Sequence, residues 1–124
     1  MELPGRRFAA GETIYSDWYP RGGDNLILRT ENIDSNGSPT VTIKVYTKND
    51  DETGDGDIIL SDAVTGDEWS LSLASTDSIK TGLLTSGKST SGIDGMKQQV
   101  RLVVEITGTG TDTWMLARVF PLIS

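Results

Sequence analysis

Hydrophobic and polar residues alternate in segment after segment of this chain, and clusters of turn residues separate the segments. The clearest case is Thr40–Lys48, where Val41, Ile43 and Val45 would face one side of a strand and polar residues the other. A period of two is typical of a half-buried β-strand, and β-branched residues suit its pleated surface. The same alternation returns in Val100–Ile106.

Such segments recur at the spacing of about 8–12 residues that β-sandwiches show, and none carries the apolar stripe of an amphipathic helix. The pattern therefore predicts an all-β fold: a single-domain antiparallel β-sandwich, jelly-roll-like, with about eight strands. In the last strand we expect Trp114, Leu116 and Phe120 to face inward. The other expected strands are Thr13–Tyr15, Asn25–Glu31, Ile58–Leu60, Trp69–Leu73, Ile79–Leu84 and Trp114–Phe120.

The first residues break the pattern. Pro4 and Gly5 resist regular structure, while Arg6–Phe8 could add to a sheet edge. We therefore expect an extended N-terminal arm over residues 1–11 and one sandwich domain over residues 12–124.

Composition narrows the chemistry. The 124 residues include no His and no Cys, so Ser-His-Asp and Cys-His mechanisms are excluded, and paired carboxylates remain open without any visible pairing. We expect no enzymatic activity. Eleven Lys and Arg against eighteen Asp and Glu give a net charge of −7, which repels nucleic acid and anionic lipid. Neither is expected as a partner.

One segment, Gly82–Ser89, matches the phosphate-loop pattern G-x-x-x-x-G-K-[ST]. That loop requires a helix immediately after it, and glycines at positions 92 and 95 oppose a helix there. We interpret the segment as part of a flexible Gly/Ser-rich stretch that continues to Gly95.

The acidic stretch between two expected strands resembles the first half of a calcium loop. Asp51, Thr53, Asp55 and Asp57 offer oxygen ligands at alternating positions, and a glycine allows the sharp turn. The twelfth position holds Asp62, where the pattern asks for Glu. The alternative is a solvated hairpin tip whose like charges prevent edge pairing.

A second candidate site is the loop Trp18–Arg21. Trp18 and Tyr19 beside Arg21 could stack on a sugar ring or anchor in a partner's pocket. Packing of Trp18 against one end of the sandwich explains the same residues.

An acidic, His-free sandwich with Thr/Ser/Gly-rich hairpins, the arm Met1–Gly11 and the apolar tail Val119–Ile123 resembles the small decoration (cement) and accessory structural proteins of tailed-phage capsids. The resemblance implies a virion protein that binds the outside of a capsid or other protein shell, stabilises it and uses no cofactor. Such proteins are commonly homo-oligomers, with a trimer favoured. Arg6, Arg7 and Phe8 would contact the shell, and the Trp18–Arg21 loop is a second contact candidate.

A different class of function stays open. The chain could be an extracellular calcium-assisted carbohydrate-binding module, with the ion held by the Asp51–Asp57 loop and the sugar stacked on Trp18 or Tyr19.

Overall fold

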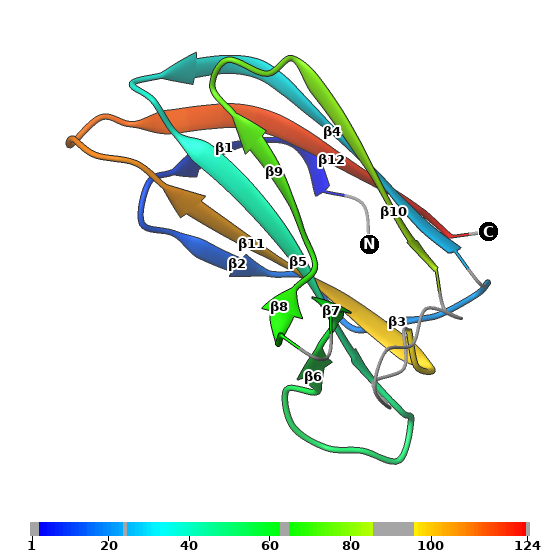
Figure 1. Cartoon of the computed structure of the whole chain (residues 1–124). Helices are drawn as coiled ribbons and strands as arrows, with labels where there is room; N and C mark the ends of the chain where they lie inside the picture. Colours follow the sequence, from blue (N-terminus) through cyan, green and yellow to red (C-terminus); the bar gives the residue numbers. More distant parts are fainter. Residues whose placement is uncertain (1–2, 24, 63–64, 86–95, 124) are drawn as a thin grey trace.

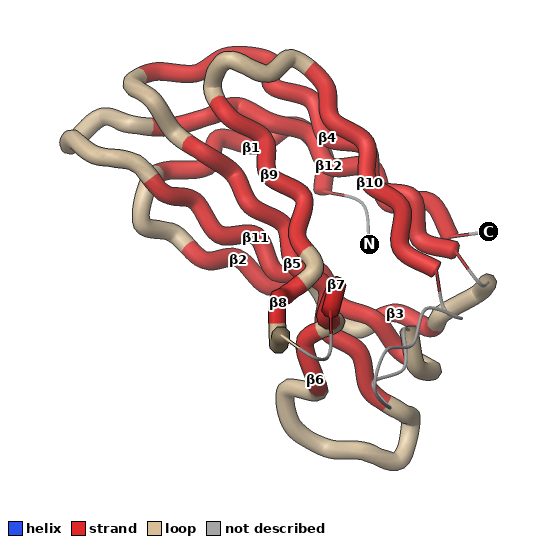
Figure 2. The backbone as a smooth tube through the Cα atoms, viewed as in Figure 1, coloured by secondary structure: helices blue, strands red, loops and turns tan. Residues whose placement is uncertain are grey.

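The computed structural model describes residues 3–23, 25–62, 65–85 and 96–123, and every regular element in these ranges is a β-strand (Figures 1 and 2). All strand pairs are antiparallel. The strands are β1 (Leu3–Ala9), β2 (Thr13–Tyr15), β3 (Tyr19–Pro20), β4 (Asn25–Asn36), β5 (Thr40–Lys48), β6 (Asp57–Ile58), β7 (Leu60–Asp62), β8 (Asp67–Glu68), β9 (Ser70–Ala74), β10 (Ile79–Thr85), β11 (Gln99–Thr107) and β12 (Trp114–Ile123).

Two sheets form the layers of the sandwich (Figure 1). The four-stranded sheet has the order β1-β12-β4-β10; the six-stranded sheet has the order β2-β11-β5-β6, with β3 also on β11 and β9 also on β5. The predicted all-β antiparallel sandwich is confirmed. The described residues contain twelve strands rather than eight because pieces such as β3, β6 and β8 are two residues long, too short for alternation to reveal.

The core lies between the two sheets. From the six-stranded sheet, Val41, Ile43 and Val45 of β5 are buried, as the alternation predicts, and β11 adds Val100, Leu102, Val104 and Ile106. From the four-stranded sheet, β4 adds Leu26 and Leu28, and β12 adds Met115, Ala117 and Val119.

The inward side of β12 was predicted wrongly. Met115, Ala117 and Val119 are buried, whereas Trp114, Leu116 and Phe120 lie on the opposite, outer side of the strand and are half-buried. Both sets of side chains are largely apolar. The sequence therefore indicated a strand but did not indicate which of its two sides faces the core.

The prediction of a separate N-terminal arm also needs correction. Residues 3–9 form β1, an edge strand that pairs with β12 in a register that includes Phe8↔Met115. The Phe8 side chain is fully buried in the core, so it is unavailable to a partner. The expected addition of Arg6–Phe8 to a sheet edge does occur, and the segment belongs to the sandwich.

The phosphate-loop pattern begins inside a strand. Gly82 lies in β10 opposite Leu28 of β4, in an antiparallel pair that no phosphate loop uses. A Cβ atom at Gly82 would lie 3.2 Å from the Trp69 ring and 3.3 Å from Leu71, so the glycine permits close packing of β9 on β10. The end of the pattern, and the whole Ser86–Gly95 stretch, fall outside the described residues.

We predict that Phe8→Ala lowers the free energy of unfolding by about 3–5 kcal/mol, because it empties a fully buried aromatic site. Denaturant unfolding would measure the loss. Phe120→Ala is the matched control: its ring lies on the outer side of β12, and we expect a loss under about 2 kcal/mol. Equal losses at the two positions would contradict the assignment of β1 to the core.

Candidate functional site

A pocket opens on the outer face of the six-stranded sheet. Tyr46 of β5 and Arg101 of β11 are direct cross-strand partners, and Tyr15 lies on the neighbouring strand β2. These three residues and Asp55, from the loop after β5, line a cavity of about 360 Å³. We call this the tyrosine pocket. Residues far apart in the sequence meet there because β11 pairs with both β2 and β5.

Arg101, one of the residues that line the tyrosine pocket, is held in place by several contacts. Its Nε donates a hydrogen bond to the Ser16 carbonyl oxygen at 2.9 Å. Its guanidinium carbon lies 4.8 Å from the ring centre of Trp18 and 5.7 Å from that of Tyr15. These cation–π contacts help to hold the guanidinium, and among the described residues its two terminal nitrogens have no hydrogen-bond partner.

Trp18 packs against the protein itself. Lys48 Nζ lies 4.5 Å from its ring centre, on a ring that Arg101 also contacts. Gly56 lies close to the Trp18 ring. A Cβ atom added at Gly56 would lie 2.8 Å from this ring and 2.6 Å from the Thr47 carbonyl oxygen, so only glycine allows this approach. The φ of +71° at Gly56 is the sharp turn that the sequence suggested, and here it lets the acidic loop dock on Trp18.

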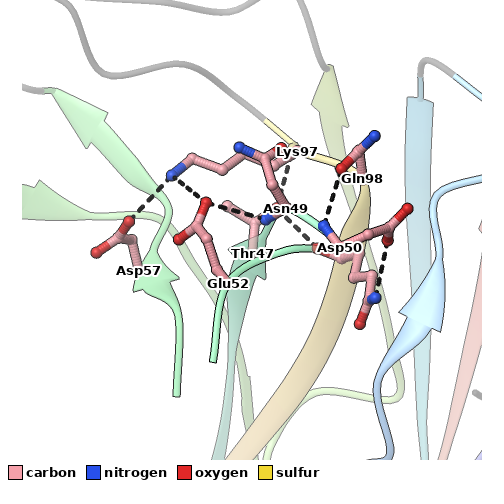
Figure 3. Close-up of polar contacts among 8 residues, drawn as sticks. Thr47, Asn49, Asp50, Glu52, Asp57, Lys97 and Gln98 are labelled. Carbon is pink, nitrogen blue, oxygen red and sulfur yellow. Dashed lines mark hydrogen bonds and ion pairs between the residues drawn. The ribbon is translucent and has the colours of Figure 1, made fainter. Parts of the chain in front are cut away.

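A lysine fastens the acidic loop to the sandwich (Figure 3). Lys97 Nζ lies 3.1 Å from an Asp57 oxygen and 3.7 Å from a Glu52 oxygen. The hydrogen bond to Asp57, helped by the charges of both carboxylates, raises the pKa of Lys97 above 10.5, although desolvation opposes the shift.

Further hydrogen bonds join the loop to the start of β11 (Figure 3). Thr47 Oγ1 donates to the Gln99 carbonyl oxygen at 2.8 Å and accepts from the Lys97 backbone N–H at 2.6 Å. The Asp50 backbone N–H donates to Gln98 Oε1, and Gln99 Nε2 donates to Asp50 Oδ1, both at 2.8 Å. The loop between β5 and β6, which extends from one end of the sandwich in Figure 2, is therefore tied at several points.

The predicted calcium ligands do not converge. Within the described ranges, no three acidic side chains come together in a group that could hold a metal ion. Asp57 is paired with Lys97, Asp55 lines the tyrosine pocket, and Asp51 and Thr53 are exposed to solvent. Lys97 therefore places a positive charge beside Asp57 and Glu52 of this loop.

Some of the other predicted contact residues make contacts within the protein, and others lie at its surface. Tyr19 lies in β3 opposite Val100, and Arg21 donates from Nη1 to the Met96 carbonyl oxygen at 2.6 Å, so both help fix the segment before β11. Arg6 is in register with Ala117.

Arg7, another predicted contact residue, lies at the surface of the four-stranded sheet. Its guanidinium carbon is 4.2 Å from the Trp114 ring centre and its Nη2 is 3.3 Å from an Asp112 oxygen.

Sequence reasoning missed the outer face of the four-stranded sheet. Leu83, Ile27 and Leu122 stand side by side across β10, β4 and β12. Leu83 and Leu122 are 58% and 59% exposed, and Ile79 is 52% exposed. The signal was present in β12, which is apolar at both alternating sets of positions, a pattern typical of strands covered on two sides. We call this surface the apolar face.

Arginines flank the apolar face. Arg29 of β4 is cross-strand partner of both Thr81 and Phe120, and its Nη2 lies 3.1 Å from a Glu31 oxygen. Arg118 is in register with Glu31 on the same face. Together with Arg7 these arginines number three, and they are matched in number by the acidic residues Glu31, Asp34 and Asp112, the last of which pairs with Arg7.

A comparison with known family models, curated proteins and solved structures found no match to this chain. Among the described residues, no helix has the length and apolar character needed to cross a membrane. Functional inference therefore depends on the two surfaces just described.

We predict that calcium leaves the melting temperature unchanged. Lys97 neutralises Asp57 and Glu52, and the remaining carboxylates of the loop are not grouped. Thermal unfolding would be followed with millimolar calcium and with chelator. If calcium raised the melting temperature by several degrees, and Asp55→Ala abolished this rise, the prediction would be contradicted. The interpretation of the loop as a calcium site would then be supported.

The Lys97 ion pairs predict a dependence on alkaline pH. Because the folded-state pKa lies above the unfolded value of 10.5, the stabilisation is complete below that pH and is lost as the pH rises through the folded-state pKa. Near neutral pH we expect the free energy of unfolding of the wild type to exceed that of Lys97→Met by about 0.2–1 kcal/mol. Above pH 10.5 we expect this difference to shrink. Denaturant unfolding at several pH values measures it; a constant difference would contradict the assignment.

Proposed function

We propose that this protein is a non-enzymatic structural protein that binds and stabilises an assembled protein shell, as a capsid decoration protein does on a virion. The observation that carries the proposal is the apolar face of the four-stranded sheet. Of the five large hydrophobic side chains that are exposed among the described residues, four lie on strands of this sheet: Ile33, Ile79, Leu83 and Leu122.

Leu83, Ile27 and Leu122 form one apolar row, and a row that contains Arg29 and Phe120 separates it from Ile79. An exposed apolar patch on a small protein marks a place where another surface docks. Covering the exposed part of each aliphatic side chain contributes about 1–2 kcal/mol. A few such side chains give only weak binding at a single site. Repetition of the site over a symmetric shell makes the binding strong, and binding that favours the assembled shell over free subunits stabilises the assembly.

Charge indicates what covers the apolar face. Arg29 lies within it and Arg118 beside it, and Arg118 forms no ion pair among the described residues, so an apolar patch with a carboxylate near Arg118 is a good complement. A second copy of the same face would bring Glu31, Asp34 and Asp112 along with its three arginines, so charge does not favour it over a surface with a surplus of carboxylates. We therefore propose the surface of a shell subunit as the occupant. Homo-oligomers, with the trimer favoured, belong to the proposal because they present several docking faces together.

The proposal predicts that a charge on the apolar face abolishes docking. Leu83→Asp combined with Leu122→Asp would place two carboxylates among apolar contacts. Purified protein would be mixed with particles isolated from the cells that produce it and separated on a density gradient. We expect wild type to sediment with the particles and the double variant to lose about tenfold or more of the bound fraction.

Ser72→Asp is the matched control, because it adds a carboxylate to an exposed position of β9 in the other sheet. It should sediment like wild type, and all variants should melt within a few degrees of one another. If wild-type protein stays in the slowly sedimenting fractions, or if the double variant binds normally, shell docking through this face is refuted.

A further inference from the structure

We propose that the tyrosine pocket binds a neutral saccharide without a metal ion. Tyr15, Tyr46, Asp55 and Arg101 line the pocket on the outer face of the six-stranded sheet. The proposal does not rest on shell docking, because the apolar face belongs to the other sheet. It also differs from the calcium-assisted site expected from the sequence, since no ion takes part.

Two aromatic rings supply the apolar part of the site. Tyr15 is 61% exposed although it lies in a paired strand, and Tyr46 projects from β5, two strands away across β11. The C–H faces of a sugar ring stack on aromatic rings, which are large, rigid and lose little conformational entropy on binding. Rings at two sides of one cavity suit a flat, partly apolar ligand of this kind.

The polar part of the site combines a free donor with a free acceptor. The terminal nitrogens of Arg101 and the carboxylate of Asp55 line the same cavity, yet they form no ion pair with each other. In the part of the chain that the structure describes, neither group has another hydrogen-bond or ion-pair partner, apart from the bond of Arg101 Nε to Ser16, and the Arg101 guanidinium also contacts the rings of Trp18 and Tyr15. Sugar hydroxyls both donate and accept hydrogen bonds, so one ligand can satisfy both groups.

The charges around the cavity favour a neutral ligand. An anion would be attracted by Arg101 but repelled by Asp55 and by a chain of net charge −7. A cation would be repelled by Arg101 and by Lys48, which lies on the same Trp18 ring. A polyhydroxylated neutral molecule can form hydrogen bonds with both Arg101 and Asp55 and is repelled by neither.

The site is also organised before any ligand binds. Ser16 and Trp18 hold Arg101, while the ion pairs of Lys97 with Glu52 and Asp57 fix the loop before and after Asp55. Groups that are already immobilised lose little entropy on binding. The cavity of about 360 Å³ is at the small end of ligand pockets, which suits one terminal sugar residue rather than a long chain.

The test is a printed array of neutral and acidic oligosaccharides, probed with the labelled 124-residue chain in the presence of chelator. We expect binding to a subset of neutral glycans, confirmed by calorimetry with the best oligosaccharide and unchanged when calcium replaces chelator. Absence of any retained glycan, retention of acidic glycans alone, or binding that needs calcium would each overturn the proposal.

Variants connect the binding to the tyrosine pocket. Tyr15→Ala removes an exposed ring and should weaken the affinity for the best oligosaccharide about tenfold or more, while Tyr15→Phe keeps most of it. The double variant Leu83→Asp, Leu122→Asp should bind the glycan like wild type, which separates this proposal from shell docking. A Tyr15→Ala variant with normal melting temperature and normal glycan affinity would show that the sugar binds elsewhere.

Discussion

Burial of β5 and β11 against β4 and β12 is the constraint on which the rest of the structure depends. Val41, Ile43 and Val45 on one side, with Leu26 and Leu28 on the other, are removed from solvent almost completely. Their burial fixes the register of four long strands, since a shift of one residue would send every one of these side chains outward. The edge strands β1 and β2 and the loops then take the positions that this register allows.

The same constraint determines which residues remain outside. Once the inward positions of β11 and β5 are set, Arg101 and Tyr46 must stand opposite each other on the outer face, and Tyr15 joins them through β2. On the other sheet, the inward set of β12 leaves Phe120 and Leu122 outward. The outer face of the six-stranded sheet thus presents Arg101 and two tyrosines, and that of the four-stranded sheet presents exposed aliphatic side chains among charged and aromatic ones.

Sequence alone predicted the fold where alternation was strict and failed where it was not. In β5 polar residues mark the outer side, so the strand and its inward residues were predicted correctly. In β12 both sides are apolar, and only tertiary packing selects Met115 over Trp114. Phe8 was assigned to a partner because Pro4 and Gly5 obscured a strand. The tyrosine pocket could not be predicted from the sequence for a different reason. Its residues come from β2, β5, β11 and a loop, and they are neighbours only because of the order of the strands in the sheet.

The two surfaces are compatible because the sandwich holds them on opposite outer faces. Sheets of a sandwich pack about 10 Å apart with their side chains interdigitated between them. A copy that docks through the apolar face therefore turns the face with Tyr15 and Arg101 toward solution. Under the two proposals, docking on a shell leaves the saccharide site open, and a symmetric shell displays it many times. Weak affinity for one sugar then suffices, because many copies attached to one particle bind a glycan-covered surface together.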